Sequence, residues 1–174
     1  MKVRLFALAF VLFALALRAQ TPAALDEAIE AGDVEKARAA LDAGADVDAG
    51  NATTPLTYAV LKHAPGERAM TFAKLFVSRE ADVNRAADVR PLYAAILRED
   101  AALAAYLVGA GADADVAGCL RATMPGTTAG ESARALAMKK GEPYVSIVSK
   151  ARAADSLKTN DKKGKLARRT LCSD

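Results

Sequence analysis

Short apolar stripes at helical spacing alternate with polar breaks along most of this chain. Leu56, Ala59 and Val60 recur at positions i, i+3 and i+4, which places them along one side of a helix. A second helix is expected after the polar break, at 70–77 in one segment and at 102–108 in another. The pattern therefore predicts an all-α fold made of helix pairs. The expected core residues are Leu56, Leu92, Leu103, Leu107, Leu136 and Val148.

Two motifs recur along the chain at a fixed distance from one another. Segments 44–48 (GADVD), 80–84 (EADVN) and 111–115 (GADAD) are alike, and their starts lie 36 and 31 residues apart. Segments 54–59 (TPLTYA) and 90–95 (RPLYAA) share a second motif, whose proline lies 11 residues after the start of the preceding first motif. A repeated offset of this kind indicates internal repeats.

Each motif has a local physical reason. Proline is tolerated at the first position of a helix, and the hydroxyl of Thr54 can cap the helix that begins there. Gly44 and Gly111 can end helices in the left-handed conformation, and the Asp or Asn residues that follow favour tight turns. Glu80 stands where the other two motifs have Gly, so we expect a strained or differently shaped helix end there.

These segments resemble the ankyrin repeat, whose units carry Thr-Pro-Leu-His-x-Ala-Ala followed later by Gly-Ala-Asp-Val-Asn. The resemblance covers about 25–153, in units at 25–48, 54–84, 90–115 and 132–150. It implies an ankyrin-like helix-turn-helix solenoid of about four repeats. The hairpin fingers between units should be short, because two connections are two residues shorter than those of the family.

The first residues have the pattern of an export signal. Lys2 and Arg4 precede 5–17, a stretch that is apolar throughout and too short to cross a bilayer. We expect cleavage after Ala19, or else after Ala16, and a periplasmic or secreted mature protein; a membrane anchor or a buried N-terminal helix is the other interpretation. The predicted parts are a signal peptide at 1–19, a repeat domain at 20–153 and a basic tail at 154–174.

The net charge of the chain falls to zero once the predicted signal is removed. The formal net charge of +3 belongs entirely to the signal, so the mature chain is neutral, with −3 at 20–153 and +3 at 154–174. No aromatic residue is interleaved with the bases of the tail, so we expect no nucleic-acid partner. We also expect no membrane span after cleavage, and a monomer when no partner is bound.

Catalytic and metal chemistry find little support in the residues. Two cysteines and one histidine cannot form a four-ligand zinc site, and His63 is expected in a solvated loop. The repeated aspartates lie too far apart for a calcium loop. We therefore expect no enzyme, no metal and no cofactor. Cys119 and Cys172 favour a disulfide in an oxidising compartment, with free or intermolecular thiols as the alternative.

The resemblance implies that a protein partner binds the hairpin connections and the first helix of each unit. Two tyrosines lie in these helices, and we expect Tyr58 in the core and Tyr93 on the surface. The candidate partner-binding residues are Asp48, Asn51, Thr53, Lys62, Arg85, Asp88, Arg90, Tyr93, Arg98 and Asp100.

Compartment and fold together suggest an exported protein-binding module, with an inhibitor or immunity role against an envelope-acting enzyme. The alternative is a structural or stress-protection protein of the envelope that has no toxin partner. Toxicity that appears on deletion of the gene, and disappears when one neighbouring hydrolase gene is also deleted, would favour the first. General sensitivity to oxidants would favour the second.

Overall fold

A computed structural model describes residues 22–50, 53–85, 88–116 and 130–158, with backbone alone for 152–158. Within these ranges the fold is all-α, with eight helices and no strand, as the sequence predicts. The helices are α2 (Pro22–Ala31), α3 (Val34–Asp42), α4 (Pro55–His63), α5 (Glu67–Ser78), α6 (Pro91–Leu97), α7 (Ala101–Gly109), α8 (Ala133–Lys140) and α9 (Tyr144–Lys158).

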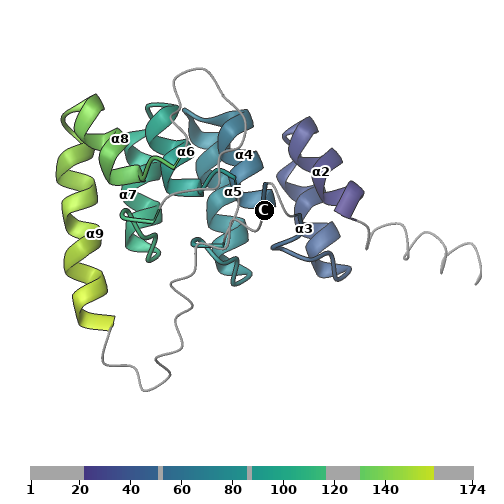
Figure 1. Cartoon of the computed structure of the whole chain (residues 1–174). Helices are drawn as coiled ribbons and strands as arrows, with labels where there is room; N and C mark the ends of the chain where they lie inside the picture. Colours follow the sequence, from purple (N-terminus) through teal and green to yellow (C-terminus); the bar gives the residue numbers. More distant parts are fainter. Residues whose placement is uncertain (1–21, 51–52, 86–87, 117–129, 159–174) are drawn as a thin grey trace, which may run out of the picture.

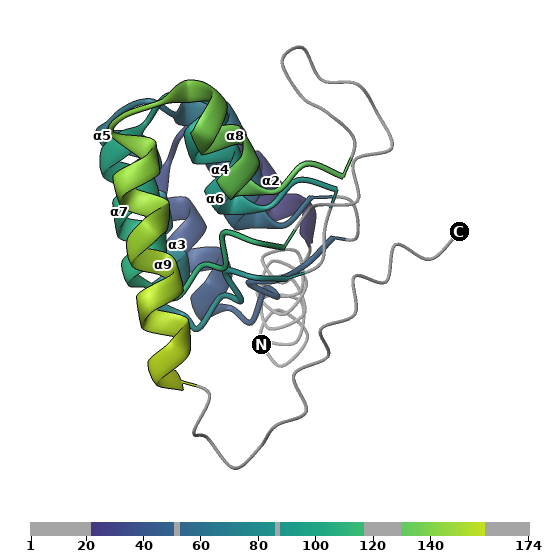
Figure 2. The same cartoon turned by 60° about the vertical axis from the view of Figure 1, so that its left-hand side comes forward.

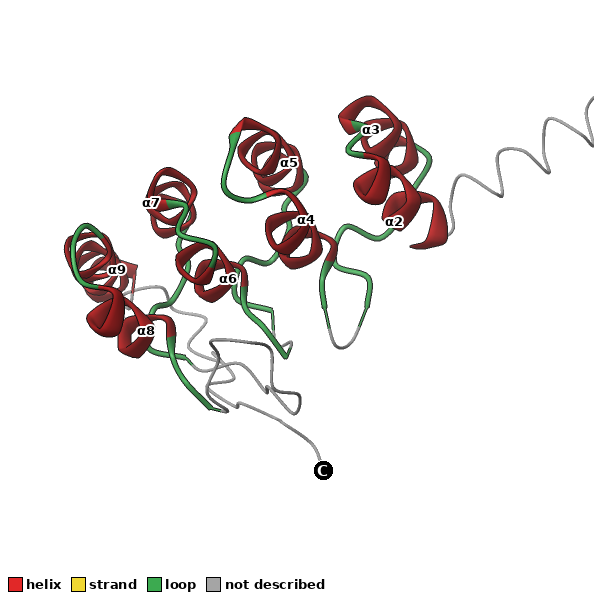
Figure 3. Cartoon of the chain, turned by 90° about the horizontal axis from the view of Figure 1, so that it is seen from above, coloured by secondary structure: helices red, strands yellow, loops and turns green. Residues whose placement is uncertain are grey.

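The helices lie in two rows (Figures 1 and 3). One row holds α2, α4, α6 and α8, and the other holds α3, α5, α7 and α9, so each row-one helix forms a hairpin with the helix that follows it. The connections between hairpins project from the first row, which is seen from the side in Figure 2. The core fills the space between the rows, and all six predicted core residues are buried there.

Several predicted features fall outside the described residues. These are the signal peptide at 1–19, Asn51, both cysteines with their disulfide, and 159–174 of the tail. The helix α9 runs to Lys158, so the first five residues of the predicted tail continue that helix. Among the residues that the structure describes, every helix is too short or too polar to cross a membrane.

The cap that the sequence predicts at Thr54 is confirmed. The hydroxyl oxygen of Thr54 accepts a hydrogen bond from the Thr57 N–H at 3.2 Å. Ser132 caps α8 in the same way, through the Ala135 N–H at 3.2 Å. Arg90 precedes α6 without a side-chain cap bond, and a proline opens that helix.

The helix ends confirm the predicted left-handed stops. Gly44 and Gly111 both have φ 95°, and Glu80 has φ 63°. The backbone at Glu80 makes the same two bonds as at Gly44, because its N–H and that of the next residue turn back to the helix end. A side chain in the left-handed region costs roughly 1–2 kcal/mol, so Glu80 forms the usual stop at a conformational cost.

Each of the three predicted turns is closed by its own side chain. Asp46 accepts from the Asp48 N–H at 2.9 Å, and Asp82 accepts from the Asn84 N–H at 2.8 Å. Asp113 accepts from the Asp115 N–H at 2.8 Å. These bonds confirm that the aspartates form turns by bonding their own backbone.

A second set of bonds joins each turn to the next. Both carboxylate oxygens of Asp48 accept from the Asp82 N–H at 3.1 Å. The amide oxygen of Asn84 accepts from the Asp113 N–H at 2.7 Å, and its NH2 group donates to the Gly111 carbonyl at 2.8 Å. The turns therefore form a continuous hydrogen-bonded series that sets the spacing of the hairpins.

Replacing Asn84 with Asp should destabilise the fold by about 1 kcal/mol. A carboxylate still accepts from the Asp113 N–H, but it cannot donate to the Gly111 carbonyl. The matched variant Asp48→Asn should cost less than about 0.5 kcal/mol, because the Asp48 side chain acts there as an acceptor. Urea unfolding measures both, and equal losses would contradict the donor role of Asn84.

Glycine at position 80 should stabilise the protein by about 1 kcal/mol, because Glu80→Gly removes the cost of a left-handed side chain. Conversely, Gly44→Ala should destabilise it by about 1 kcal/mol. A methyl group at Gly44 meets no atom within 4 Å, so its effect is conformational only. Thermal unfolding of the two variants tests this, and a destabilised Glu80→Gly protein would refute it.

Candidate partner-binding surface

Six of the predicted binding residues form two groups, at opposite ends of the helices of the first row. Asp48, Thr53, Arg85 and Asp88 lie in the connections that precede its helices, whereas Lys62 and Arg98 lie where α4 and α6 end. A helix of nine residues such as α4 is roughly 13 Å long. The two groups are therefore separate surfaces, and the exposed part of the row between them decides whether one partner can reach both.

Three of the predicted surface residues are buried instead. Arg90 is 7% exposed, Tyr93 is 3% exposed and Asp100 is 8% exposed. The prediction that they present their side chains to a partner is therefore wrong. Each of them satisfies polar groups inside the protein.

Tyr93 is buried more deeply than Tyr58, which reverses the order that the sequence analysis expects. The Tyr93 hydroxyl donates to Glu131 at 3.0 Å, and Glu131 also pairs with Lys139 at 2.5 Å. Tyr58 is half-buried, and its hydroxyl donates to the exposed Glu30. Tyr93 is thus a core residue, contrary to its prediction, whereas Tyr58 packs against the core but is only partly buried, so its predicted place is confirmed in part.

The register of the helices explains this reversal. Tyr93 lies two residues after the proline that opens α6, and Thr57 lies two residues after the proline that opens α4. Thr57 donates to the carbonyl of Val89 at 3.3 Å, just before the next helix pair, as Tyr93 donates to Glu131. This position faces the following hairpin, whereas Tyr58 lies one residue further round the helix.

Asp100 joins two hairpins. One carboxylate oxygen caps α7 by accepting from the Leu103 N–H at 2.9 Å. The other oxygen accepts from the Gly66 N–H at 3.1 Å, in the turn between α4 and α5. The carboxylate is therefore occupied on both sides, which is the physical reason for its burial.

The guanidinium of Arg90 is buried beneath the second connection. It donates to the carbonyl of Asn84, so it ties the start of α6 to the preceding turn. Burial lowers the pKa of Arg90, and the negative charges of Asp113 and Asp82 oppose that shift. Arg90 thus fixes the start of α6 by donating to the connection, whereas a threonine cap would accept from the first N–H groups of the helix.

His63 is not a solvated loop residue as predicted, because it ends α4 and is half-buried. Its Nε2 atom lies 2.6 Å from the carbonyl oxygen of Ile29, and its ring stacks on Phe72 at 5.4 Å. The histidine therefore ties α4 to α2.

The other exposed residues of the first row lie along α2, at the end of α4 and at the end of α8. Lys62 pairs with Glu30 at 2.5 Å, so Glu30 receives both this ammonium and the Tyr58 hydroxyl. The next helix offers much less surface, because α6 is buried from Pro91 to Ile96. At the end of α6, Arg98 is exposed and donates to the carbonyl of Ala64 at 2.9 Å.

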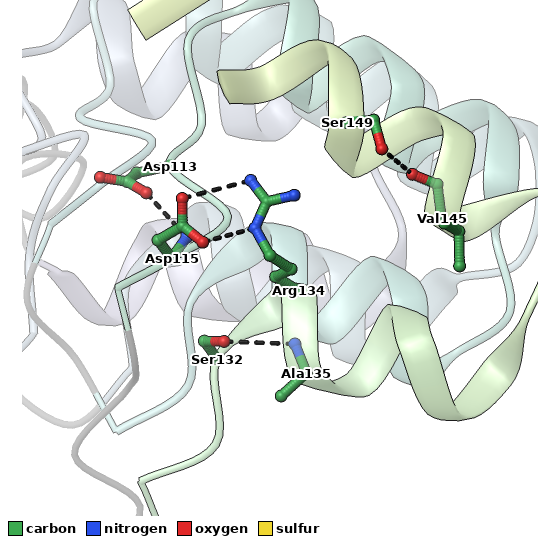
Figure 4. Close-up of polar contacts among 7 residues, drawn as sticks. All are labelled: Asp113, Asp115, Ser132, Arg134, Ala135, Val145 and Ser149. Atoms are coloured by element: carbon green, nitrogen blue, oxygen red, sulfur yellow. Dashed lines mark hydrogen bonds and ion pairs between the residues drawn. The ribbon is translucent and has the colours of Figure 1, made fainter. Parts of the chain in front are cut away.

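The series of turns ends at an ion pair (Figure 4). Asp115 has the same place in its turn as Asp48, but its carboxylate accepts from Arg134 of α8 at 2.5 and 3.2 Å. This hydrogen bond raises the pKa of Arg134. The Asp115 carboxylate thus accepts from a charged side chain of α8, whereas the Asp48 carboxylate accepts from the backbone N–H of Asp82.

Within the described ranges, no group of three or more His, Cys, Asp or Glu side chains is placed to hold a metal ion. No protein-family model matches the chain, and no curated protein sequence matches it. The site is therefore defined by its own geometry: a half-exposed tyrosine between an acidic helix and a partly apolar one.

Replacing Tyr93 with Phe should destabilise the protein by about 1–2 kcal/mol, because the buried Glu131 carboxylate loses a donor. The matched variant Tyr58→Phe should cost less than about 0.5 kcal/mol, because water can replace the hydroxyl at an exposed carboxylate. Chemical unfolding of both variants provides the comparison. A larger loss for Tyr58→Phe would contradict the assignment of Tyr93 to the core.

Proposed function

We propose that the described helices form an ankyrin-like solenoid of about four repeats. The observation that carries the proposal is a recurring separation of 34 residues between hydrogen-bonded groups of neighbouring hairpins. This separation is close to the ~33-residue period of ankyrin units. The four bonds join His63 to Ile29, Gly66 to Asp100, Asp82 to Asp48 and Arg98 to Ala64.

The proposed function is that of an exported protein-binding module, which inhibits or neutralises an enzyme that acts on the cell envelope. Export rests on the signal pattern of 1–19. Protein binding rests on the repeated hairpins, because such arrays bind partners over an extended surface. The inhibitor or immunity role rests on the combination of compartment and fold.

Affinity purification of the tagged full-length protein from the exported fraction should recover one envelope enzyme in stoichiometric amount. Adding the purified protein to that enzyme should inhibit it. The matched control lacks residues 1–19, remains in the cytoplasm and should recover no such enzyme. Absence of any stoichiometric partner from the exported fraction would contradict the proposal. General oxidant sensitivity on gene deletion, with no such partner, would support the envelope-protection alternative.

A further inference from the structure

The exposed face of α2 and α4 has a definite chemical character. Backbone bonds give the register: the Gly32 N–H bonds the Ile29 carbonyl as the Glu99 N–H bonds that of Ile96. Ile29 and Ile96 are therefore equivalent. Two residues before them, Glu27 of α2 is therefore equivalent to Ala94 of α6. Ala94 is also equivalent to Tyr58 of α4, because each of these two lies three residues after the proline that opens its helix.

Neighbouring helices of a row pack about 8–10 Å apart, so equivalent residues lie side by side. The exposed Glu27 thus stands next to Tyr58, and Glu30 stands next to Leu61, which is half-buried. We call Glu27, Glu30, Tyr58 and Leu61 the tyrosine face. It has an acidic border on α2 and an aromatic and aliphatic surface on α4.

The tyrosine face is held in place before any partner arrives. The Tyr58 hydroxyl donates to Glu30, and the same carboxylate pairs with Lys62 at 2.5 Å. A side chain that is already fixed loses less conformational entropy on binding. Tyrosine is also among the residues that carry most binding energy in protein interfaces.

We infer that the tyrosine face binds a protein segment in which a lysine or arginine stands next to an apolar side chain. The cation fits over the ring of Tyr58 and beside the carboxylate of Glu27, where cation–π and ionic attraction act together. The apolar side chain fits against Leu61. This inference rests on the proposed function, and it specifies the chemistry of the partner at one surface.

Calorimetric titration with a short peptide of alternating arginine and leucine tests the inference on the mature full chain. We expect saturable, salt-sensitive binding, and no binding of the peptide that carries glutamate in place of arginine. Tyr58→Ala should weaken binding about tenfold or more, and Glu27→Gln several-fold. The control Glu35→Gln, on an exposed acid of α3, should leave binding unchanged.

Circular dichroism should show that each variant is folded. If the Tyr58→Ala protein is unstable, the Tyr58→Phe protein provides a second test, because phenylalanine keeps the ring. The inference is overturned if the glutamate peptide binds as well, or if Glu27→Gln and Glu35→Gln behave alike. It is also overturned, with protein binding itself intact, if Tyr58→Ala retains the envelope enzyme recovered by the unaltered protein. Recovery of no enzyme would refute the proposed function alone, because the peptide titration is independent of it.

Discussion

The first three helix pairs are tied to one another by side chains that reach a backbone group about one unit further along the chain. Asp48 holds the Asp82 N–H, Asn84 holds the Asp113 N–H, and Thr57 holds the Val89 carbonyl. The bond from Thr57 is buried, so the Val89 carbonyl needs it as a partner, whereas the bond between Asp48 and Asp82 is exposed. These bonds set the register of neighbouring helices, and the register decides which side chains remain exposed.

The bonds between hairpins involve several polar residues that the sequence analysis predicts on the binding surface. Arg90 and Asp100 are charged, yet both are buried because they satisfy groups of an adjoining turn. Tyr58 is different, because it is half-buried against the core while its hydroxyl bonds an exposed carboxylate. A surface for a partner therefore arises where the bonds between hairpins leave a side chain fixed but only half-buried.

The features that sequence reasoning predicts correctly are local. The Thr54 cap, the left-handed stops at Gly44 and Gly111 and the aspartate turns each depend on residues fewer than five positions apart. At Glu80, where we expect a strained or differently shaped end, the helix ends with the same bonds as at Gly44 and with a left-handed residue.

The misassigned residues depend on the neighbouring unit instead. Tyr93 and Tyr58 lie in similar motifs, but one faces the next hairpin and the other faces outward. The two tyrosines differ by a single position along the helix. The motif alone does not show which of these positions faces the following hairpin. Comparing Tyr93 with Thr57, rather than with Tyr58, is the alignment that would have placed it in the core.

The last hairpin shows how the bonding between hairpins continues where no further helix pair follows among the described residues. Asp115 keeps the turn of Asp48, and Arg134 takes the part of the missing N–H. Met138 lies five residues into α8, as Ile96 does in α6, yet it is 66% exposed whereas Ile96 is fully buried. The exposed lysines at 139 and 140 adjoin it and keep this end polar, which fits the proposed solenoid if this hairpin is its terminal repeat. We therefore place the proposed partner surface on the tyrosine face, where hydrogen bonding fixes the half-buried Tyr58, and not on this end, where the exposed side chain is a flexible methionine.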